Sequence, residues 1–587
     1  MLPRDSKGEN RLAVFGVLGL VLAIRLLQLS SAMGSPLTYQ PGPDEDYYRR
    51  FGMAVVAGQG AQDSPEFTFM DPAYGYLLGG IFKLFGVNVF VVYLLQILLD
   101  TATAYGIIRV GRLLERPRAG LIGAAIYGLT ATAVMFCTTL LKEVWVAAWL
   151  TWWIVGALTV VRSERKVHWL VFGVYCGVGV GFRSTLLMLT LAGALLPWLA
   201  RRLGVRRSAG GGADDTVAGG TERSAASPTL AALVVLGSIV AMLPWSVRNH
   251  NAYGSLSPLP HNGGIVLQQV YNDQNPRAEI WIPPFVSYLH PSEIWAGYAA
   301  EASRRLGRPL PPVEVDHYWH DEAMAYIEQH PGVVAGDIAR KSLGWLSSSE
   351  LANNRSDTEE RMFSTILTLL PSPAAWLLGL GLAGLLWLAL QDRRWIIVAV
   401  PIFLAWATMA VFFAESRFRF HAASMLALCS GVWIDQLVRH IRARERRPLA
   451  VFIPLAVAIM AVSIALGTQT REPPVSWERI AWGYINMGRI HEAQVLAARI
   501  ARDQPDNGAI LEALGFTDAV QKQYTEAAQV LQRAVELRPR SHVAHFNLAR
   551  VYLALGDRPK ALEEATTAMS LHPEPDYQAL LNQIQSQ

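Results

Sequence analysis

Long apolar runs separated by short polar segments occupy most of the chain up to about residue 467. A run of about 20 apolar residues is long enough to cross a bilayer as a helix. Eleven runs approach or reach this length, near residues 12–29, 87–108, 119–137, 144–161, 167–181, 185–200, 229–246, 374–390, 395–413, 418–438 and 449–467. The pattern predicts an all-α fold, a polytopic transmembrane helical bundle of about 11 spans.

The C-terminal part follows a different pattern, an internal repeat of 34 residues. The repeat is marked by Pro505, Pro539 and Pro573 and by Ala493, Ala527 and Ala561. Small residues and a closing proline at this period are typical of tetratricopeptide repeats (TPR). Each such unit is a helix pair that buries its apolar face against its neighbours. We therefore expect three pairs over about 477–573 in an α-solenoid, which serves either a peptide partner or a spacer or dimer contact.

Composition agrees with a membrane protein, because 52% of the 587 residues are hydrophobic and 17% are charged. Cytoplasmic loops of membrane proteins are enriched in Lys and Arg. With the N-terminus in the cytoplasm, the inner segments hold 22 of these residues and the short outer loops hold six. The six are Arg49, Arg50, Lys142, Arg183, Arg417 and Arg419. This bias predicts a cytoplasmic N-terminus and an extracytoplasmic TPR domain.

Four blocks follow from these patterns. We expect an N-terminal transmembrane catalytic module with the first outer loop at 1–246, an extracytoplasmic loop at 247–362, C-terminal spans at 363–467 and a TPR domain at 473–587. Within the first block, the Gly-, Ala- and Ser-rich stretch 207–227 predicts a flexible inner linker. The three cysteines, Cys137, Cys176 and Cys429, lie in or beside apolar runs, so no disulfide framework is expected.

An acidic cluster, Asp44-Glu45-Asp46, follows the first span at once. Carboxylates beside a bilayer are costly to bury and are therefore candidates for function. Asp44 could take a proton from an attacking hydroxyl, with Glu45 or Asp46 orienting the acceptor or tuning the base. Asp44 could equally cap the N-terminus of the helix that begins after Pro43. The two interpretations are compatible.

Arginines mark the outer ends of several spans, at Arg183, Arg248, Arg417 and Arg419. Guanidinium groups bind phosphate oxygens in pairs and keep their charge when partly buried. These side chains could therefore bind the phosphate of a lipid carrier, or they could extend to lipid headgroups. Headgroup contact is the favoured interpretation for Arg25 in the first span, whereas phosphate binding is favoured for Arg417 and Arg419.

A metal site has little support in the sequence. His317 and His320 share a helix face, but without a further ligand an exposed amphipathic helix accounts for them better. We therefore expect no metal and no cofactor besides a lipid-linked sugar as co-substrate, although a divalent ion is not excluded. Membrane lipids and a protein bound through the TPR array are the other expected partners, and no nucleic acid is expected.

Four segments resemble the GT-C class of integral-membrane glycosyltransferases, the branch with protein O-mannosyltransferases and lipid A aminoarabinose transferases. In order, they are Asp44-Glu45, Asp71-Pro72-Ala73-Tyr74-Gly75-Tyr76, Pro244-Trp245-Ser246-Val247-Arg248-Asn249 with His261-Asn262-Gly263-Gly264, and Glu415-Ser416-Arg417-Phe418-Arg419. The likeness extends over about residues 10–440. It departs from the family at Phe420-His421, where relatives often have proline, which leaves the sugar and the acceptor open.

The resemblance implies transfer of a sugar from a polyprenyl-phosphate carrier to an acceptor hydroxyl on the outer face of a bacterial plasma membrane. It maps the catalytic base to Asp44 and the residues that hold the lipid phosphate to Arg417 and Arg419. We further predict Glu45 in acceptor positioning and Arg183, Arg248 and Glu415 in substrate binding. A lipid phosphate leaves readily once cations stabilise its charge, so one carboxylate and a few arginines suffice, and attack from the opposite face predicts inversion.

Two other functions remain open. A non-catalytic membrane scaffold would use the TPR array to organise envelope assembly, and it would be indifferent to Asp44→Asn. A transporter of lipid-linked sugars would need polar groups at mid-depth along several spans, and the apolar runs show few.

Overall fold

The computed structural model describes residues 9–59, 65–202, 222–275, 281–286, 290–352, 354–371, 374–468 and 474–586. All regular elements in these residues are helices, which confirms the predicted all-α class. The chain forms two compact units: Met1–Ser30 with Gly42–Pro473, and Ser31–Pro41 with Pro474–Gln587. The expected linker falls largely outside the described residues, as its positions 207–221 do.

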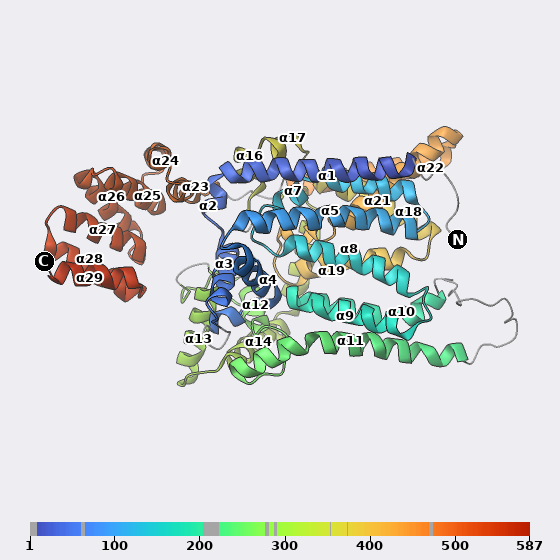
Figure 1. The fold of residues 1–587 in the computed structure, drawn as a ribbon, viewed down its shortest axis with the longest axis horizontal. Coiled ribbons are helices and arrows are strands. Elements are labelled where there is room, and N and C mark those ends of the chain that lie inside the picture. The colour runs from blue at the N-terminus through green and yellow to red at the C-terminus, as the bar shows by residue number, and fades with distance from the viewer. Residues whose placement is uncertain are drawn as a thin grey trace. The chain divides into compact units, whose positions relative to one another are not determined.

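The first unit contains the membrane bundle (Figure 1). Six helices of the described chain are long and apolar enough to cross a membrane. They are α1 (Glu9–Gly34), α5 (Val89–Leu113), α8 (Glu143–Val160), α11 (Glu222–Tyr253), α18 (Ala374–Gln391) and α22 (Arg446–Gly467). Shorter apolar helices are α9 (Lys166–Phe182), α10 (Leu187–Arg202) and α19 (Trp395–Val411). The neighbours α5, α8, α9 and α11 pack in that order.

The expected count of about 11 spans is not confirmed. The run 119–137 forms α6 (Pro117–Gly128) and α7 (Ala131–Phe136). The run 418–438 is likewise divided between α20 (Ser416–Phe420) and α21 (Ala423–Ala443). Apolar composition predicted both runs, but it does not indicate where the helical hydrogen bonds stop.

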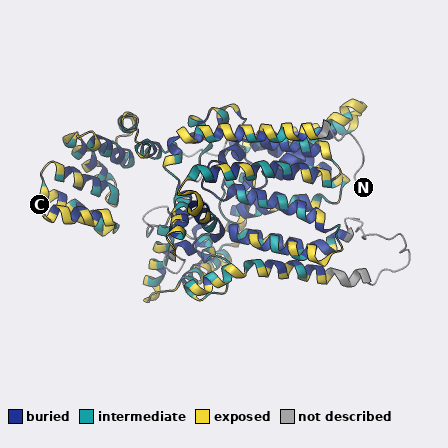
Figure 2. Ribbon diagram, viewed as in Figure 1, coloured by how far each residue is buried: buried dark blue, intermediate teal, exposed yellow. Residues whose placement is uncertain are grey.

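Apolar side chains cover much of the outside of the bundle. Leu12 and Phe15 of α1 and Val451 of α22 are among the most exposed of them. Figure 2 shows exposed residues along α1 and along the part of α11 whose burial is described. Water would disfavour such a surface, whereas lipid tails match it, so the bundle is a multi-pass membrane unit.

Arg25 does not extend to the headgroups, and the expectation from sequence was wrong. Its side chain is fully buried, and its Nε donates to Asp100 Oδ2 of α5 at 2.9 Å. Tyr127 also donates to Asp100, and Arg25 donates to the carbonyls of Tyr127 and Gly128. These carbonyls lie where α6 ends, and the guanidinium gives the Gly128 carbonyl a donor where the helix break supplies none, while the Tyr127 carbonyl also accepts from the Thr130 N–H at 3.1 Å. Its partner lies 75 residues away, beyond any local pattern.

Shorter helices gather at the end of the bundle away from the N-terminus (Figure 1). They are α3 (Pro43–Val56), α4 (Pro72–Phe85), α12 (Gly263–Val270), α13 (Pro291–Leu306), α14 (Pro312–Gln329), α15 (Pro331–Trp345), α16 (Asp357–Phe363) and α17 (Thr365–Leu369). Several begin with proline, whose fixed φ suits the first helical position. His317 and His320 lie exposed on α14, and the described residues hold no group of three side chains placed to bind a metal.

The second unit is a TPR solenoid, as the 34-residue period predicted. Its helices are α23 (Trp477–Asn486), α24 (Ile490–Asp503), α25 (Gly508–Val520), α26 (Tyr524–Leu537), α27 (His542–Ala554), α28 (Arg558–Leu571) and α29 (Pro575–Ser586). The repeated alanines, Ala493, Ala527 and Ala561, are fully buried where paired helices cross. A short helix from the N-terminal part of the chain, α2 (Pro36–Tyr39), packs on α23.

Candidate active site

A cavity of about 290 Å³ lies where the loops after α1 and α11 meet the ends of the spans. Its charged lining consists of three carboxylates and three cations from segments far apart in the sequence. They are Asp44, Asp71, Glu415, Lys142, Arg183 and Arg417. The rest of its lining is neutral and includes the amides of Asn262 and Gln269 and the ring of Phe413. Such a cavity suits a ligand with both an anionic and an uncharged polar part.

Asp44 lies in the first turn of α3, but it is not the cap of that helix. Gly42 holds the N-cap position, and its N–H donates to Glu45 Oε2 at 3.1 Å, so the interpretation of Asp44 as the cap was wrong. The Asp44 carboxylate instead accepts from Asn354 Nδ2 at 2.8 Å and from Arg417 Nη1 at 2.6 Å, both at Oδ2. Its Oδ1 has no hydrogen-bond partner among the described residues.

Arg417 joins two carboxylates of the cavity. Its Nε donates to Glu415, while Nη1 donates to Asp44. Burial alone would lower the pKa of Arg417, but the two carboxylates outweigh it and raise the pKa, so the guanidinium stays charged. Burial raises the pKa of Glu415, against the opposing effect of Arg417. Within the described chain Nη2 has no partner, which leaves donors for a further anion.

The other two cations are held by carboxylates from different elements. Lys142, at the start of α8, pairs with Asp71, which also accepts from the Ser184 N–H at 3.0 Å. Arg183, at the end of α9, donates through Nη1 to Glu143 Oε2 at 3.0 Å. Asp71 occupies the N-cap position of α4 but makes no capping bond, so its side chain is committed to the cavity wall.

Arg183 is also linked to the late segment that carries Arg417. His421 Nε2 lies 2.5 Å from the Glu143 oxygen that Arg183 contacts and 3.0 Å from Arg183 Nη1. The Arg183 guanidinium lies 4.8 Å from the centre of the Phe418 ring. Phe420-His421, which departs from the family pattern, therefore places a histidine against the second cation of the cavity.

Three residues predicted for the site lie outside the cavity lining. Glu45 is buried and receives two hydrogen bonds from Arg355, at 2.7 and 2.8 Å. Arg248 donates to the Phe67 carbonyl at 2.8 Å and to the Tyr76 hydroxyl at 3.3 Å. Arg419 donates to the carbonyls of Ser347 and Ser349 and pairs with Glu350 at 2.9 Å. Their predicted substrate contacts stay predictions, and the geometry gives each another partner.

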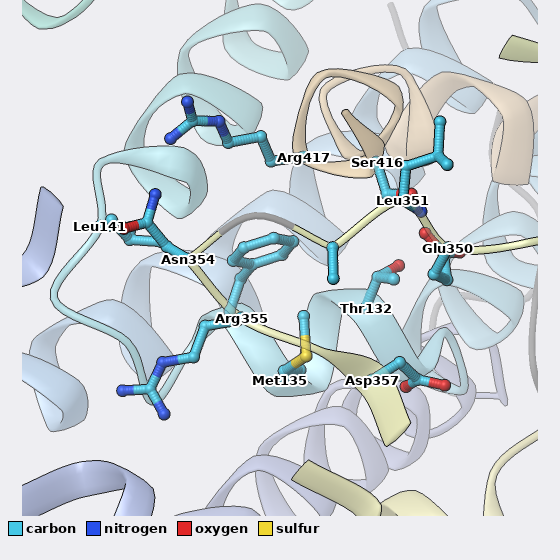
Figure 3. Close-up of a pocket in the computed structure, with 12 residues that line it drawn as sticks. Thr132, Met135, Leu141, Glu350, Leu351, Asn354, Arg355, Asp357, Ser416 and Arg417 are labelled. Carbon is cyan, nitrogen blue, oxygen red and sulfur yellow. Dashed lines mark hydrogen bonds between the residues drawn. The ribbon is translucent and has the colours of Figure 1, made fainter. Parts of the chain in front are cut away.

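A smaller cavity of about 20 Å³, with room for about one water, adjoins the first (Figure 3). Asn354 and Arg417 line both cavities. Figure 3 shows Asn354 between the side chains of Arg417 and Arg355. Asn354 thus lies between Arg417, in the wall of the large cavity, and the buried pair of Arg355 with Glu45.

Sequence reasoning gave no site role to Asp71 or Asn354 and no decision on Lys142. Asp71 belongs to one of the segments that carry the resemblance. Its position directly before a helix of the outer side was the signal that could have identified it as a site residue. Lys142 was counted only among the basic residues of the short outer loops. Asn354 lies in an irregular stretch before α16, and no local pattern distinguishes it.

Comparison with known proteins gives one family match in the membrane unit and one in the repeat unit. Residues 63–208 match the dolichyl-phosphate-mannose-protein mannosyltransferase family, and residues 521–584 match the tetratricopeptide repeat. The first match contains Asp71, Lys142 and Arg183, while Asp44 and Arg417 lie outside it. A stretch of 99 residues, which is 17% of the chain, aligns with anaphase-promoting complex subunit 3 of Schizosaccharomyces pombe at 29% identity. The alignment covers 15% of that protein.

Solved structures with partial similarity include the oligosaccharyltransferase of Archaeoglobus fulgidus in its apo form, at 13% identity and a TM-score of 0.41. The same organism's oligosaccharyltransferase AglB with an inhibitory peptide and a dolichol-phosphate gives 13% identity and a TM-score of 0.38. Each alignment covers 80% of this chain and 57% of the other, so the chain spans little more than half the length of these proteins. Residues 63–208 thus resemble the dolichyl-phosphate-mannose-protein mannosyltransferases, and residues 521–584 resemble tetratricopeptide repeats.

Proposed function

We propose that the protein transfers a sugar from a polyprenyl-phosphate carrier to an acceptor hydroxyl on the outer face of the membrane. The ion pair of Asp44 with Arg417, at 2.6 Å in the wall of the large cavity, is the observation that carries this proposal. It joins a carboxylate that can accept a proton to a guanidinium that can bind phosphate. The match of residues 63–208 to mannosyltransferases that use a lipid phosphate supports the same chemistry.

In the proposed reaction, Asp44 Oδ1 accepts the proton of the acceptor hydroxyl. The hydroxyl oxygen forms a bond to the anomeric carbon, and the bond from that carbon to the phosphate oxygen breaks with inversion. The polyprenyl phosphate leaves with the electron pair. Arg417, with Arg183 and Lys142 across the cavity, stabilises the charge that grows on the phosphate.

The contacts of Arg417 also imply that the donor binds before Asp44 acts on the acceptor. In the free protein its Nη1 is engaged by Asp44 and its Nε by Glu415. A donor phosphate bound at Nη2 competes with Asp44 for the same guanidinium. Donor binding therefore weakens the pair at Oδ2 and leaves more of the negative charge of the Asp44 carboxylate for the acceptor proton at Oδ1.

The outer-face location rests on charge and on topology. Lys and Arg are concentrated in the segments assigned to the cytoplasm. The cavity lies among helices at the end of the bundle away from the N-terminus (Figure 1). We assign the protein to a bacterial plasma membrane, with a cytoplasmic N-terminus and an extracytoplasmic TPR array that recruits a protein acceptor or an assembly partner.

The test compares lipid extracts of a deletion strain, its parent and two complemented strains by mass spectrometry. One complementing gene carries Asp44→Asn, and the other lacks the codons for 474–587. Transfer predicts that one polyprenyl-phosphate sugar accumulates in the deletion strain and in the Asp44→Asn strain, with the variant protein present at the parental level. Parental lipids in the Asp44→Asn strain would remove the mechanism. A phenotype confined to loss of the array would favour the scaffold.

A further inference from the structure

The segment Ser31–Pro41 connects α1 to α3 in the chain but packs with the TPR unit. Its short helix α2 lies on α23, the first helix of the array. The array therefore has two attachments in the sequence. One is its own N-terminus, and the other is the connection that leads directly to the helix of Asp44.

Hydrogen bonds from α23 hold the end of this segment. Asn486 Nδ2 donates to the Tyr39 carbonyl at 3.0 Å and to Gln40 Oε1 at 2.8 Å. Arg479 Nε donates to the Gln40 carbonyl at 3.0 Å. Two of these bonds go to backbone carbonyls, so they fix the course of the chain and not only a side chain.

Gly483 allows the close approach of the two elements. A Cβ at this position would lie 2.2 Å from the Pro36 carbonyl oxygen, which is less than any real contact. The positions 34 and 68 residues later in the repeat are Thr517 and Val551, both buried. The repeat fold therefore accepts a larger residue here, and the glycine of the first repeat is required by the segment.

The residues that make the hydrogen bonds are also particular to the first repeat. Asn486 corresponds to Val520 and Ala554 at the same period. None of these later residues carries an amide. The first repeat thus differs from the others at positions that face the segment, as expected if these residues serve the contact with the segment and not the repeat fold.

The held segment ends where the catalytic helix begins. Gln40 is bound by α23, Gly42 is the N-cap of α3, and Asp44 follows two residues later. A Cβ on Gly42 would meet the Asn354 carbonyl oxygen at 2.9 Å, so the start of α3 has little freedom on its other side as well. Only Pro41 lies between the two constrained residues.

We propose that the first TPR repeat positions Asp44 by holding residues 31–41, with Gly483, Asn486 and Arg479 as positioning residues. Release of residues 31–41 from the first repeat frees the entry to α3 and lets the carboxylate move relative to Arg417. If residues 31–41 only covered the end of the solenoid, the same contact would form, but its loss would not change α3. This inference rests on the proposed role of Asp44.

Hydrogen–deuterium exchange of the full-length protein in lipid nanodiscs distinguishes the two roles. The variant Gly483→Val introduces the residue that the third repeat already has at this position, so the contact with Pro36 opens while the repeat fold is kept. Thr517→Val is the matched control in the second repeat. We expect at least tenfold faster exchange in peptides from 31–41 and from 42–56 in Gly483→Val, and wild-type exchange in Thr517→Val. Faster exchange in 31–41 alone would overturn the proposal.

Activity gives a second readout on the donor that the lipid comparison identifies. Misplacement of the base lowers kcat and does not raise the KM for the donor, because Arg417 stays in place and loses only a carboxylate that competes with the phosphate. Wild-type kcat in a variant with faster exchange at 42–56 would overturn the positioning role. If no transfer is found at all, the proposed function fails while the exchange result still reports the coupling.

A second variant covers the case in which Gly483→Val does not fold. Asn486→Ala removes the bonds to Tyr39 and Gln40, and the exposed Asn582→Ala in α29 is its control. The same increase in exchange at 42–56 is expected for Asn486→Ala only. Equal exchange in the two alanine variants would contradict the proposal.

Discussion

Arg355 and its two carboxylates form a buried ionic framework behind the cavity. Its Nε and Nη2 donate to the two oxygens of Glu45 at 2.7 and 2.8 Å, and Nη1 donates to Glu360 at 2.5 Å. The side chains of Arg355, Glu45 and Glu360 are 2%, 1% and 7% exposed, so water cannot replace a lost partner. We predict that Glu45 acts through this framework, by holding the start of α3, and not through contact with the acceptor.

The expected losses differ in size. Arg355→Met leaves two buried carboxylates without their cation, which costs about 3–5 kcal/mol of unfolding free energy. Glu45→Gln keeps the pair of Arg355 with Glu360 and loses charge-assisted hydrogen bonds, which costs about 1.5–3 kcal/mol. The triple variant Glu45→Gln, Arg355→Met, Glu360→Gln regains most of the loss of Arg355→Met, because no unpaired charge is left buried.

Denaturant titration in detergent micelles measures these losses. A thiol-reactive fluorescent dye reports unfolding, because Cys137, Cys176 and Cys429 are all buried in the folded protein. Arg442→Met, at an exposed position of α21, is the control and should leave the midpoint unchanged. An Arg355→Met variant as stable as the wild type, or a triple variant less stable than Arg355→Met, would refute the reasoning.

Two further predictions concern other buried groups. Arg25→Leu leaves Asp100 buried without its cation and should cost about 3–5 kcal/mol in the same titration, and Arg25→Leu with Asp100→Leu should recover most of it; a silent Arg25→Leu would restore the headgroup interpretation. Burial lowers the pKa of His261 to about 4, with the neighbouring His317 acting in the same direction. The unfolded chain takes up that proton at about pH 6.5, so the contribution of His261 to stability is present above pH 6.5 and declines as the pH falls toward about 4. His261→Gln should flatten this decline in unfolding titrations between pH 7 and 5, whereas the exposed His491→Gln should not; equal slopes would contradict the assignment.

The sequence predicted the large features of the fold because they arise from periodic burial. The 34-residue repeat follows from small residues at helix crossings, such as Ala493 and Ala527, and the structure has them fully buried. The apolar runs predicted the bundle in the same way. The division of the run 119–137 into α6 and α7 could not be predicted, because no local pattern shows that Arg25 donates to the carbonyls at the break from another helix.

The candidate site was predictable only in part. Asp44 and Arg417 were chosen from distant segments, and the structure brings them into contact. Arg248 and Arg419 had the same position at the outer end of a span, yet Arg248 binds the carbonyl of Phe67 in a short 3-10 helix and Arg419 binds that of Ser349 in a loop. A sequence shows that a cation stands at this depth, but not which oxygen atoms the fold offers it. The same holds for Asn354, which donates to Asp44 from a loop that lies 310 residues further along the chain.

The role of Asp44 as the base is tested most directly by single-turnover transfer from the donor to an acceptor hydroxyl by purified protein, followed as release of polyprenyl phosphate. Asp44→Asn is compared with Asp46→Asn, in which the neighbouring carboxylate, bound to Arg49 and Arg50 at 2.6 Å each, is neutralised outside the cavity. The account predicts a loss of about 10²–10⁴-fold in rate for Asp44→Asn, the range of general-base catalysis, and little change for Asp46→Asn. Equal rates for the two variants would contradict it.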